Sequence, residues 1–382
     1  MRVTRGELFA LPPRWLFLRL ETDGGLCGWG EPIVEGRAST VATAVGELLE
    51  HVVGRDPRDV EDLFQVLYRG GFYRGGPILM SALSGIEQAL WDIKARDLGL
   101  PVHALLGGRV RTRMRVYAWI GGDRPEQAAA DAVARVAQGY RAVKMNATGE
   151  AGYAETPAFV AAAAARAMAV REAVGDRVDL AIDFHGRVHT ALAAQLIEAL
   201  APARPMFIEE PVLPEHIEVL PELARRTTVP LATGERMYGR WGFRDLLARG
   251  GVAIVQPDVS HAGGIWETRK IAAMAEAYDV ALAPHCPLGP IALAAALQVD
   301  ACTPNALIQE ESLGIHYHEG GELDTYLADG AWLTPTDGYV NLPDGPGLGI
   351  TLDEARIRQG AQAVPGWRNP VWRLADGSVA EW

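Results

Sequence analysis

The sequence predicts an α/β protein in which an N-terminal α+β capping domain precedes a parallel TIM barrel of the (β/α)7β type. From about residue 114, eight short apolar segments follow one another, and a stretch with helical spacing comes after each of the first seven. Such alternation implies parallel strands joined by right-handed crossovers. A nearly complete set of eight strands closes into a barrel rather than an open sheet. Before residue 100 the order differs, because extended segments come first and helical ones follow.

The N-terminal domain begins with extended chain over residues 1–35. WLFLRLET alternates apolar and polar positions, a DGG turn follows, and LCGWGEP completes a hairpin signature. Over residues 40–100, apolar residues recur at helical spacing in TVATAVGELLEHVV, DVEDLFQVLYRG and ILMSALSGIEQALWDIKARDLGL. The last of these is a long helix that begins at Pro77, a residue suited to a first helical turn, and ends at a GLP sequence.

The predicted barrel strands are short, apolar and tipped by polar residues. In chain order they are MRVYAWIGG (114–122), AVKMN (142–146), VDLAIDFHG (178–186), MFIEEPV (206–212), VPLATGE (229–235), AIVQPDVS (253–260), VALAPHC (280–286) and ALIQEES (306–312). The expected division is a capping domain at 1–113, the barrel at 114–318 and a C-terminal segment at 319–382. This segment is rich in glycine, proline and tryptophan, and we expect it to pack back on the capping domain and complete it.

Composition excludes several classes of protein. The 382 residues are 49% hydrophobic and 22% charged, which excludes a disordered or fibrous chain. The formal net charge of -12 argues against a nucleic-acid partner and against an anionic lipid surface. No apolar run has the length of a membrane span, the N-terminus lacks the apolar region of a signal peptide, and the three cysteines lack CxxC spacing. We therefore expect a cytoplasmic enzyme without a membrane partner.

Three acids at the ends of successive strands are the strongest chemical signal. Asp183, Glu209 and Glu235 are each 26 residues apart, which is one strand–helix unit. The C-terminal ends of barrel strands form the catalytic face, so these side chains point toward a common centre. Three converging carboxylates repel one another unless a cation lies among them, and all-oxygen ligation selects a hard metal such as Mg2+. A single acid at a strand end is as often a helix N-cap, but three at this spacing favour a metal site.

Two histidines accompany these acids. Asp258, His285 and Glu310 end the next three strands, and His185 lies two residues after Asp183. Strand alternation would point Asp183 and His185 into the barrel mouth together. A carboxylate that holds one imidazole nitrogen fixes the tautomer and raises the basicity of the other. A single histidine is more often structural, but two on strands four apart face each other, as one base and one opposing acid require.

Several segments resemble a known family. They are FYRGGPILMSALSGIEQALWDIK, DFHGR, FIEEPV, GERM, QPDVSHAGGI, APHCPLGPIALAAALQ, IQEESLGIHY and WRNPVWRLADGSVAEW. They resemble the mandelate racemase branch of the enolase superfamily, and within it most closely the D-galactonate dehydratases. The resemblance covers essentially the whole chain, and it implies a closed homo-oligomer, with an octamer as the suggested state.

The resemblance also implies a role for each residue of the site. It makes Asp183, Glu209 and Glu235 the Mg2+ ligands, His285 the base with Asp258 as its partner, His185 the general acid and Glu310 the stabiliser of the enolate oxygens. The reaction implied is dehydration of a sugar acid, D-galactonate, by removal of the C2 proton and protonation of the departing 3-hydroxyl. A neutral Glu310 would donate a hydrogen bond to the enolate, and the product is a 2-keto-3-deoxy acid.

The second strand departs from the pattern of the superfamily's racemases. Those enzymes usually carry Lys-x-Lys there, whereas this chain has Lys144 and Asn146 around a methionine. An amide cannot exchange a carbon-bound proton, so His285 is left as the main candidate base, which fits a dehydratase. Two interpretations of Lys144 stay open: it offsets the charge of the substrate carboxylate, or it is an ion-pair partner at the barrel mouth.

The capping domain is expected to close over the polyol end of the substrate. We predict that residues 14–37 and the glycine-rich loop RGGFYRGGP form this lid. Arg74, Arg187 and Arg236 are candidate contacts to the polyol or carboxylate, although a solvated surface role is the more ordinary one for an arginine. Trp29 is expected to pack in the core.

Other functions fit part of this pattern. A dehydratase for D-gluconate would use the same catalytic residues, since gluconate differs from galactonate only at C4. A racemase or epimerase is opposed by Asn146 and by the lack of a second-face base other than His185. A non-catalytic barrel used for binding would not need a complete metal and acid–base set.

Overall fold

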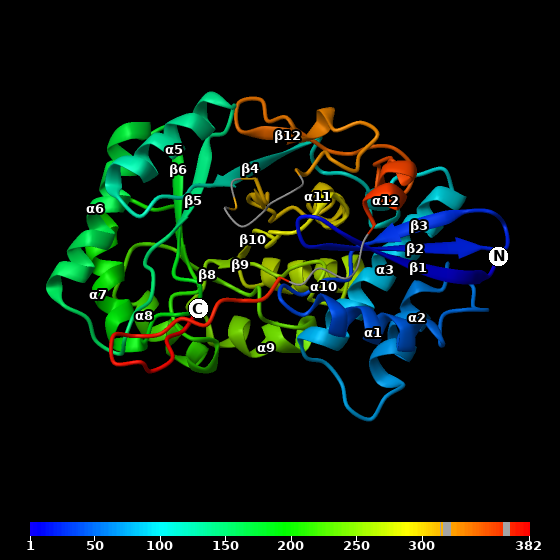
Figure 1. Cartoon of the computed structure of the whole chain (residues 1–382), viewed down its shortest axis with the longest axis horizontal. Coiled ribbons are helices and arrows are strands. Elements are labelled where there is room, and N and C mark those ends of the chain that lie inside the picture. The colour runs from blue at the N-terminus through cyan, green and yellow to red at the C-terminus, as the bar shows by residue number, and fades with distance from the viewer. Residues whose placement is uncertain (314, 316–321, 362–366) are drawn as a thin grey trace.

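The protein consists of an α+β unit beside a barrel (Figure 1). The computed structural model describes residues 1–313, 315, 322–361 and 367–382. The two units lie next to each other along the long axis of the molecule. Within the described residues, no helix combines the length and apolar character needed to cross a membrane.

The N-terminal unit has three antiparallel strands followed by helices, as the sequence predicted. They are β1 (Val3–Leu11), β2 (Trp15–Thr22), β3 (Cys27–Gly30), α1 (Ala38–Leu49), α2 (Val60–Arg69), α3 (Pro77–Asp97) and the short α4 (Val102–Leu105). Helix α3 begins at Pro77 and lies between β3 and the barrel helix α10, so most of it is buried. Its backbone approaches β3 closely, because a Cβ atom at Gly30 would overlap the carbonyl of Gly85.

The barrel alternates strand and helix from β4 to β11. Its elements are β4 (Arg113–Trp119), α5 (Pro125–Ala137), β5 (Ala142–Asn146), α6 (Pro157–Val174), β6 (Asp179–Asp183), α7 (Thr190–Leu200), β7 (Phe207–Glu209), α8 (Leu220–Ala224), β8 (Leu231–Thr233), α9 (Gly239–Arg249), β9 (Ile254–Val255), α10 (Ile265–Glu276), β10 (Ala281–Leu282), α11 (Pro290–Ala301) and β11 (Gln309–Glu310). Neighbouring strands from β4 to β10 are parallel, and β11 pairs with β4. A parallel bridge between Leu282 and Ala306 joins the two ends, so the predicted (β/α)7β barrel is confirmed.

The barrel interior is filled by one side chain from each of the eight strand segments. This layer consists of four alanines and four larger residues, namely Tyr117, Ala142, Ala181, Phe207, Ala232, Ile254, Ala283 and Ile308. All eight side chains are buried, and the rings of Tyr117 and Phe207 meet at 6.3 Å. The layer forms a packed floor beneath the strand ends, as side-chain layers do in barrels of this type.

The chain after the barrel touches both units. Strand β12 (Tyr339–Asn341) pairs antiparallel with β4, and helix α12 (Glu354–Gly360) packs against β1. Residues 367–382 continue to the barrel, where the C-terminus lies near β8 in Figure 1.

Candidate active site

A cavity of about 1230 Å³ opens at the C-terminal ends of the barrel strands. The barrel contributes Asn146, Asp183, His185, Glu235, His261 and His285 to its walls, among others. The N-terminal unit contributes Arg14, Val34, Glu35 and Pro77, and the C-terminal residues contribute Trp367, Arg368, Asn369, Pro370, Trp372 and Trp382. Three distant parts of the chain therefore enclose one site.

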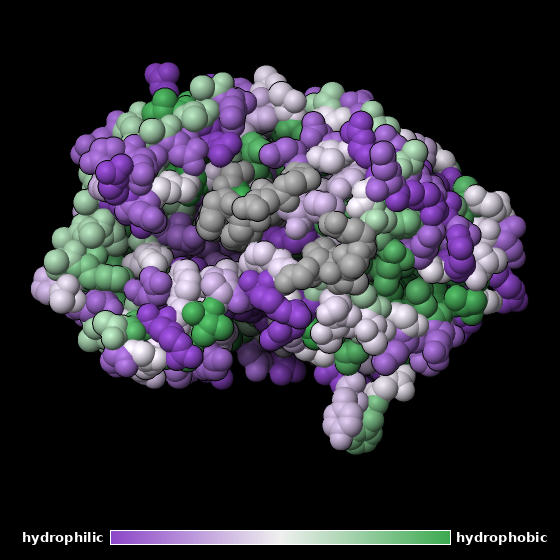
Figure 2. Space-filling view, in the orientation of Figure 1, coloured by the Kyte–Doolittle hydropathy of each residue, from purple (hydrophilic) through white to green (hydrophobic). Residues whose placement is uncertain are grey.

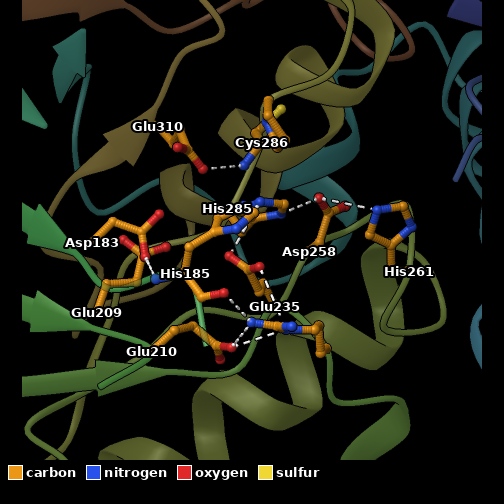
Figure 3. A network of polar contacts seen from close by, with 12 residues as sticks. Asp183, His185, Glu209, Glu210, Glu235, Asp258, His261, His285, Cys286 and Glu310 are labelled. Atoms are coloured by element: carbon orange, nitrogen blue, oxygen red, sulfur yellow. Dashed lines mark hydrogen bonds and ion pairs between the residues drawn. The ribbon is translucent and has the colours of Figure 1, made fainter. Parts of the chain in front are cut away.

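The three predicted metal ligands lie at this mouth. Asp183 and Glu209 are the last residues of β6 and β7 and are paired in register, and Glu235 follows β8 by two residues. Their residue exposures are 1%, 0% and 9%, so all three acids are buried. Figure 3 shows their side chains together with those of His185 and His285. Asp183 and Glu235 line the cavity wall.

Two of these acids are poorly compensated by the protein. Burial, followed by the charge of Glu209, raises the pKa of Asp183 to about 7. Burial also raises the pKa of Glu235, and the carboxylates of Glu210 and Glu209 add to that rise. The Oδ2 atom of Asp183 has no hydrogen-bond partner among the described residues. Buried carboxylates in this state are stabilised by a cation.

Lys144 is an ion-pair partner beneath the cavity, which decides between the two interpretations of this residue. Its side chain is fully buried, and its Nζ lies 3.0 and 2.8 Å from the two carboxylate oxygens of Glu209. The same Nζ lies 2.7 Å from Oε1 of Glu310. Burial alone would lower the pKa of Lys144, but these two carboxylates raise it well above its ordinary value. The lysine therefore stays charged.

Glu310 has contacts other than those expected of a neutral hydrogen-bond donor. Both of its oxygens already accept hydrogen bonds, Oε1 from Trp119 Nε1 at 2.7 Å and Oε2 from the backbone N–H of Cys286 at 2.8 Å. Burial would raise the pKa of Glu310, but Lys144 and His285 lower it. An ionised carboxylate cannot donate a hydrogen bond to an enolate. Glu310 is also absent from the described wall of the cavity.

Asp258 holds two histidines, of which only one was predicted. His285 Nδ1 lies 2.8 Å from Asp258 Oδ2, and its Nε2 lies 3.4 Å from Glu235 Oε2. Burial would lower the pKa of His285, but Glu235, Glu310 and Asp258 raise it well above normal. His261 Nε2 lies 3.6 Å from the same Asp258 oxygen, and its Nδ1 lies 2.8 Å from Ser81 Oγ (Figure 3).

His185 reaches the cavity by a route other than the predicted one. Strand β6 ends at Asp183, so strand alternation does not orient His185. Its backbone is left-handed, with φ of 57°, and its N–H donates to Asp183 Oδ1 at 2.5 Å. Arg236 Nη2 holds the carbonyl of His185 at 2.8 Å. A tight turn, and not a continued strand, therefore points this imidazole at the cavity.

An ion pair between Arg236 and Glu210 supports that turn, and of the two residues only Arg236 was predicted to lie at the site. Arg236 Nε and Nη2 donate to Glu210 Oε2 at 2.9 and 2.6 Å, and Thr233 Oγ1 donates to Glu210 Oε1 at 2.5 Å. The Gly186 N–H donates to the Glu210 carbonyl. A Cβ atom at Gly186, where φ is 55°, would collide with the Arg236 guanidinium. The EE pair that ends β7 is the only sequence signal that pointed to Glu210.

Comparisons with known proteins agree with this architecture. Residues 13–107 match the N-terminal domain of mandelate racemase / muconate lactonizing enzymes, and residues 127–356 match the enolase C-terminal domain-like family. The chain belongs to the enolase superfamily. This confirms the resemblance derived from the sequence motifs.

Curated superfamily relatives span the whole chain. A D-galactonate dehydratase of Ralstonia nicotianae is 56% identical over 382 residues, and one of Pectobacterium atrosepticum is 53% identical over the same length, with 100% of both chains covered in each case. Among solved structures, a putative galactarate dehydratase of Agrobacterium radiobacter, with bound Na and L-malate, has a TM-score of 0.91 at 33% identity over 100% of both chains. A putative dehydratase of Mesorhizobium loti has a TM-score of 0.88 at 31% identity, covering 95% of this chain and 99% of that one.

Enolase-superfamily dehydratases generally use a divalent metal, and the donor chemistry here fits one. The candidate ligands are three buried carboxylates, and one oxygen of Asp183 has no protein partner in the described structure. As the side chains stand, no three His, Cys, Asp or Glu groups among the described residues are arranged to hold an ion. Lys144 instead bonds both oxygens of Glu209. The residues supply the ligand type that a hard cation prefers, although in this structure they are not arranged around a common point.

Of the two segments predicted to form a lid, one lines the cavity and the other does not. The segment with Arg14 and Glu35 lines the cavity, but the RGGFYRGGP loop between α2 and α3 extends away from the body (Figure 2). Phe72 and Tyr73 in that loop are 91% and 84% exposed, and of its described residues only Pro77 lines the cavity. The rings of Phe72 and Tyr73 lie 5.3 Å apart and contact each other, so in this structure the loop lies away from the cavity that it was predicted to cover.

The remaining predicted residues divide between site and scaffold. Arg187 lines the cavity, where its Nη1 donates to the Thr148 carbonyl at 3.2 Å, and Arg236 holds the turn already described. Arg74 is exposed and lies outside the described cavity wall. Trp29 is 8% exposed and belongs to the hydrophobic core, as expected.

Proposed function

We propose that the chain dehydrates D-galactonate to 2-dehydro-3-deoxy-D-galactonate and water, with Mg2+ as its cofactor. The observation that carries the proposal is that one cavity is lined by His285, by His185 and by buried acids. Asp258 holds the His285 imidazole, and one oxygen of Asp183 has no hydrogen-bond partner among the described residues. The full-length relatives named D-galactonate dehydratase support the choice of substrate.

His285 is the base in this proposal. Asp258 accepts a hydrogen bond from Nδ1, so Nε2 is the nitrogen that faces Glu235 and the cavity, and in its deprotonated form it takes the C2 proton. The carboxylate partner raises the basicity of the imidazole, which suits it to remove the proton at C2 of a sugar acid. Asn146 also lines the cavity, and an amide there offers no competing base.

His185 is the general acid. Its ring lines the same cavity from the turn after β6, whereas His285 comes from the loop after β10. It protonates the departing 3-hydroxyl, and elimination with acid and base on opposite faces is anti. Arg236 fixes the backbone from which this ring projects.

Asp183, Glu209 and Glu235 would hold the cation. When bound, Mg2+ stabilises the negative charge that develops on the substrate carboxylate as the C2 proton leaves. Glu310 pairs with Lys144 and accepts the N–H of Cys286, next to His285. It therefore positions the base without touching the enolate.

A pair of histidine variants tests the acid and base assignment. His285→Asn is expected to lose both dehydration and exchange of the C2 proton with solvent deuterium. His185→Asn is expected to lose dehydration but to retain reaction with a 3-fluoro analogue, whose leaving group needs less protonation. Identical behaviour of the two variants in both assays would contradict separate roles.

D-Gluconate dehydration is the second candidate, since its C2 and C3 configuration is the same. A site that hydrogen-bonds one C4 epimer rejects the other because its polar groups are left unpaired. We expect kcat/KM for D-galactonate to exceed that for D-gluconate by at least about a hundredfold. Equal values would leave the dehydratase chemistry in place and overturn the galactonate assignment. An epimerase is a weaker candidate and would release 2-epimer without keto acid.

We also propose a cytoplasmic homo-oligomer, with the octamer as the state suggested by family resemblance. Mass photometry of the purified chain gives the subunit number directly. A monomer at micromolar concentration would overturn this part of the proposal.

A further inference from the structure

The last residues of the chain form a distinct part of the site that none of the proposed roles includes. We name residues 367–382 the C-terminal strap. It contributes three tryptophans to the cavity wall, Trp367, Trp372 and Trp382. Trp382 is the last residue of the chain, yet it is partly buried rather than free in solvent.

A small hairpin returns the chain end to the barrel. Leu374 and Ser378 are joined by a backbone hydrogen bond of 2.9 Å, and the Ala380 N–H donates to the Trp372 carbonyl at 3.0 Å. Ala380 is 8% exposed, so the end of the hairpin is packed. The ring of Trp382 then lies 6.4 Å from that of Trp372 and 6.0 Å from that of Trp367.

Contacts to both units of the protein anchor the strap. The Arg187 guanidinium lies 4.7 Å from the ring of Trp372, and the Arg14 guanidinium lies 5.0 Å from the ring of Trp367. Arg368 Nη1 donates to the Gly36 carbonyl at 3.0 Å. Arg187 belongs to the barrel, and Arg14 and Gly36 belong to the N-terminal unit. The strap therefore crosses the cavity between them.

Trp382 meets the ring of His185. The two rings lie 5.4 Å apart at an angle of 90°, which is the edge-to-face geometry preferred by aromatic pairs. Nδ1 of His185 is buried and has no hydrogen-bond partner among the described residues. His285, by contrast, is held by Asp258 through a hydrogen bond of 2.8 Å. The two imidazoles are thus held by different means, one by a carboxylate and one by an indole.

We propose that Trp382 is a positioning residue for His185: its indole holds the imidazole toward the substrate, and the C-terminal strap closes that side of the cavity to water. The inference rests on the proposed dehydratase function, in which His185 protonates the leaving hydroxyl. Misplacement of an acid by about 1 Å lowers a rate by about a hundredfold. Removing the indole therefore weakens loss of the hydroxyl and spares proton removal by His285.

The kinetic test separates these two steps. Trp382→Ala is expected to lower kcat for dehydration by about ten- to a hundredfold while exchange of the C2 proton with deuterium continues. Trp382→Phe restores most of the rate, because a phenyl ring can make the same edge-to-face contact. Val379→Ala is the matched control, since Val379 lies in the same strap and is 66% exposed. Parallel loss of dehydration and exchange in Trp382→Ala, or loss of neither, would overturn the inference.

A second measurement does not depend on turnover. Diethyl pyrocarbonate modifies accessible imidazoles, and peptide mass spectrometry gives its rate at each histidine. Modification of His185 is expected to rise several-fold in Trp382→Ala and to stay unchanged in Val379→Ala, with His285 as the internal reference. An unchanged rate at His185 overturns the inference. If the rate rises but no aldonate is dehydrated, the proposed function fails and the packing of Trp382 on His185 stands.

Discussion

Carboxylates are buried in two regions of this molecule, and the protein compensates them differently. At the interface between the N-terminal unit and the barrel, Glu31 accepts the N–H groups of Gly289 and Ala292 at 2.7 and 3.0 Å. Glu87 accepts those of Ile265 and Trp266 at 2.7 and 2.9 Å, and also Trp91 Nε1. These two acids meet the N-termini of α11 and α10, where free N–H groups and the helix dipole favour negative charge.

At the barrel mouth the protein supplies fewer donors. One oxygen of Asp183 accepts the His185 N–H and the other has no described partner. The contacts of Glu235 are ion pairs at 3.4 Å to His285 and 3.8 Å to Arg236. Glu31 and Glu87, whose oxygens accept backbone hydrogen bonds, hold the two units together. Asp183 and Glu235, which have fewer donors, are available to a ligand.

A shifted pKa does not separate these two kinds of acid. Burial raises the pKa of Glu31 and of Glu87 to about 8 and that of Asp183 to about 7. The three groups are all desolvated, but they differ in the hydrogen bonds that they accept. The pattern of donors, and not the shift, distinguishes a structural acid from a site acid.

The largest expected effect is that of metal removal. Exhaustive chelation is expected to lower dehydration by at least about a thousandfold, because the substrate carboxylate loses the cation that stabilises its developing negative charge, and added Mg2+ restores the activity. Turnover and bound metal are measured on the same samples. Full turnover in metal-free protein would show that the mouth acids need no cation.

Two charge-neutralising variants are expected to have opposite effects: one lowers activity and spares stability, and the other lowers stability. Glu235→Gln is expected to lower kcat at least about a hundredfold while the melting temperature holds or rises, since the buried carboxylate that it removes has only long ion-pair contacts. Glu87→Gln is expected to lower the free energy of unfolding by about 1–3 kcal/mol, because an amide cannot accept all three donors. Calorimetry and initial rates distinguish them. If Glu235→Gln lost as much stability as Glu87→Gln, the proposed difference between the mouth acids and the interface acids would be wrong.

The smallest expected effect concerns Glu311, a buried acid with a single donor. Tyr140 OH donates to its Oε2 at 2.6 Å, Oε1 has no described partner, and burial raises its pKa to about 8. A raised folded-state pKa means that its stabilising contribution is complete below about pH 4.5 and is lost as pH rises through about 8.

Glu311→Gln keeps a neutral side chain at every pH, so the fall in melting temperature between pH 6 and pH 9 is expected to be shallower by a few degrees. The exposed Glu222→Gln is the matched control. Unchanged slopes in both variants would mean that Glu311 is ionised throughout.

The sequence by itself determined the barrel, the capping unit and the position of the site residues at the C-terminal ends of the strands. Apolar spacing within each segment sets strand or helix, and the 26-residue interval between Asp183, Glu209 and Glu235 follows from the repeat of the strand–helix unit. These are local properties of the chain, so they can be derived without knowing which segments meet.

Only the tertiary structure decided what each side chain meets. Lys144 on β5 and Glu310 on β11 flank the same strand, β4, only because the barrel closes, and this closure brings Lys144 Nζ to Glu310 Oε1. Arg236 bends the chain at His185. Trp382 reaches the same ring from the end of the chain. The charge state and orientation of a group depend on neighbours brought together by folding, and sequence spacing carries no record of those neighbours.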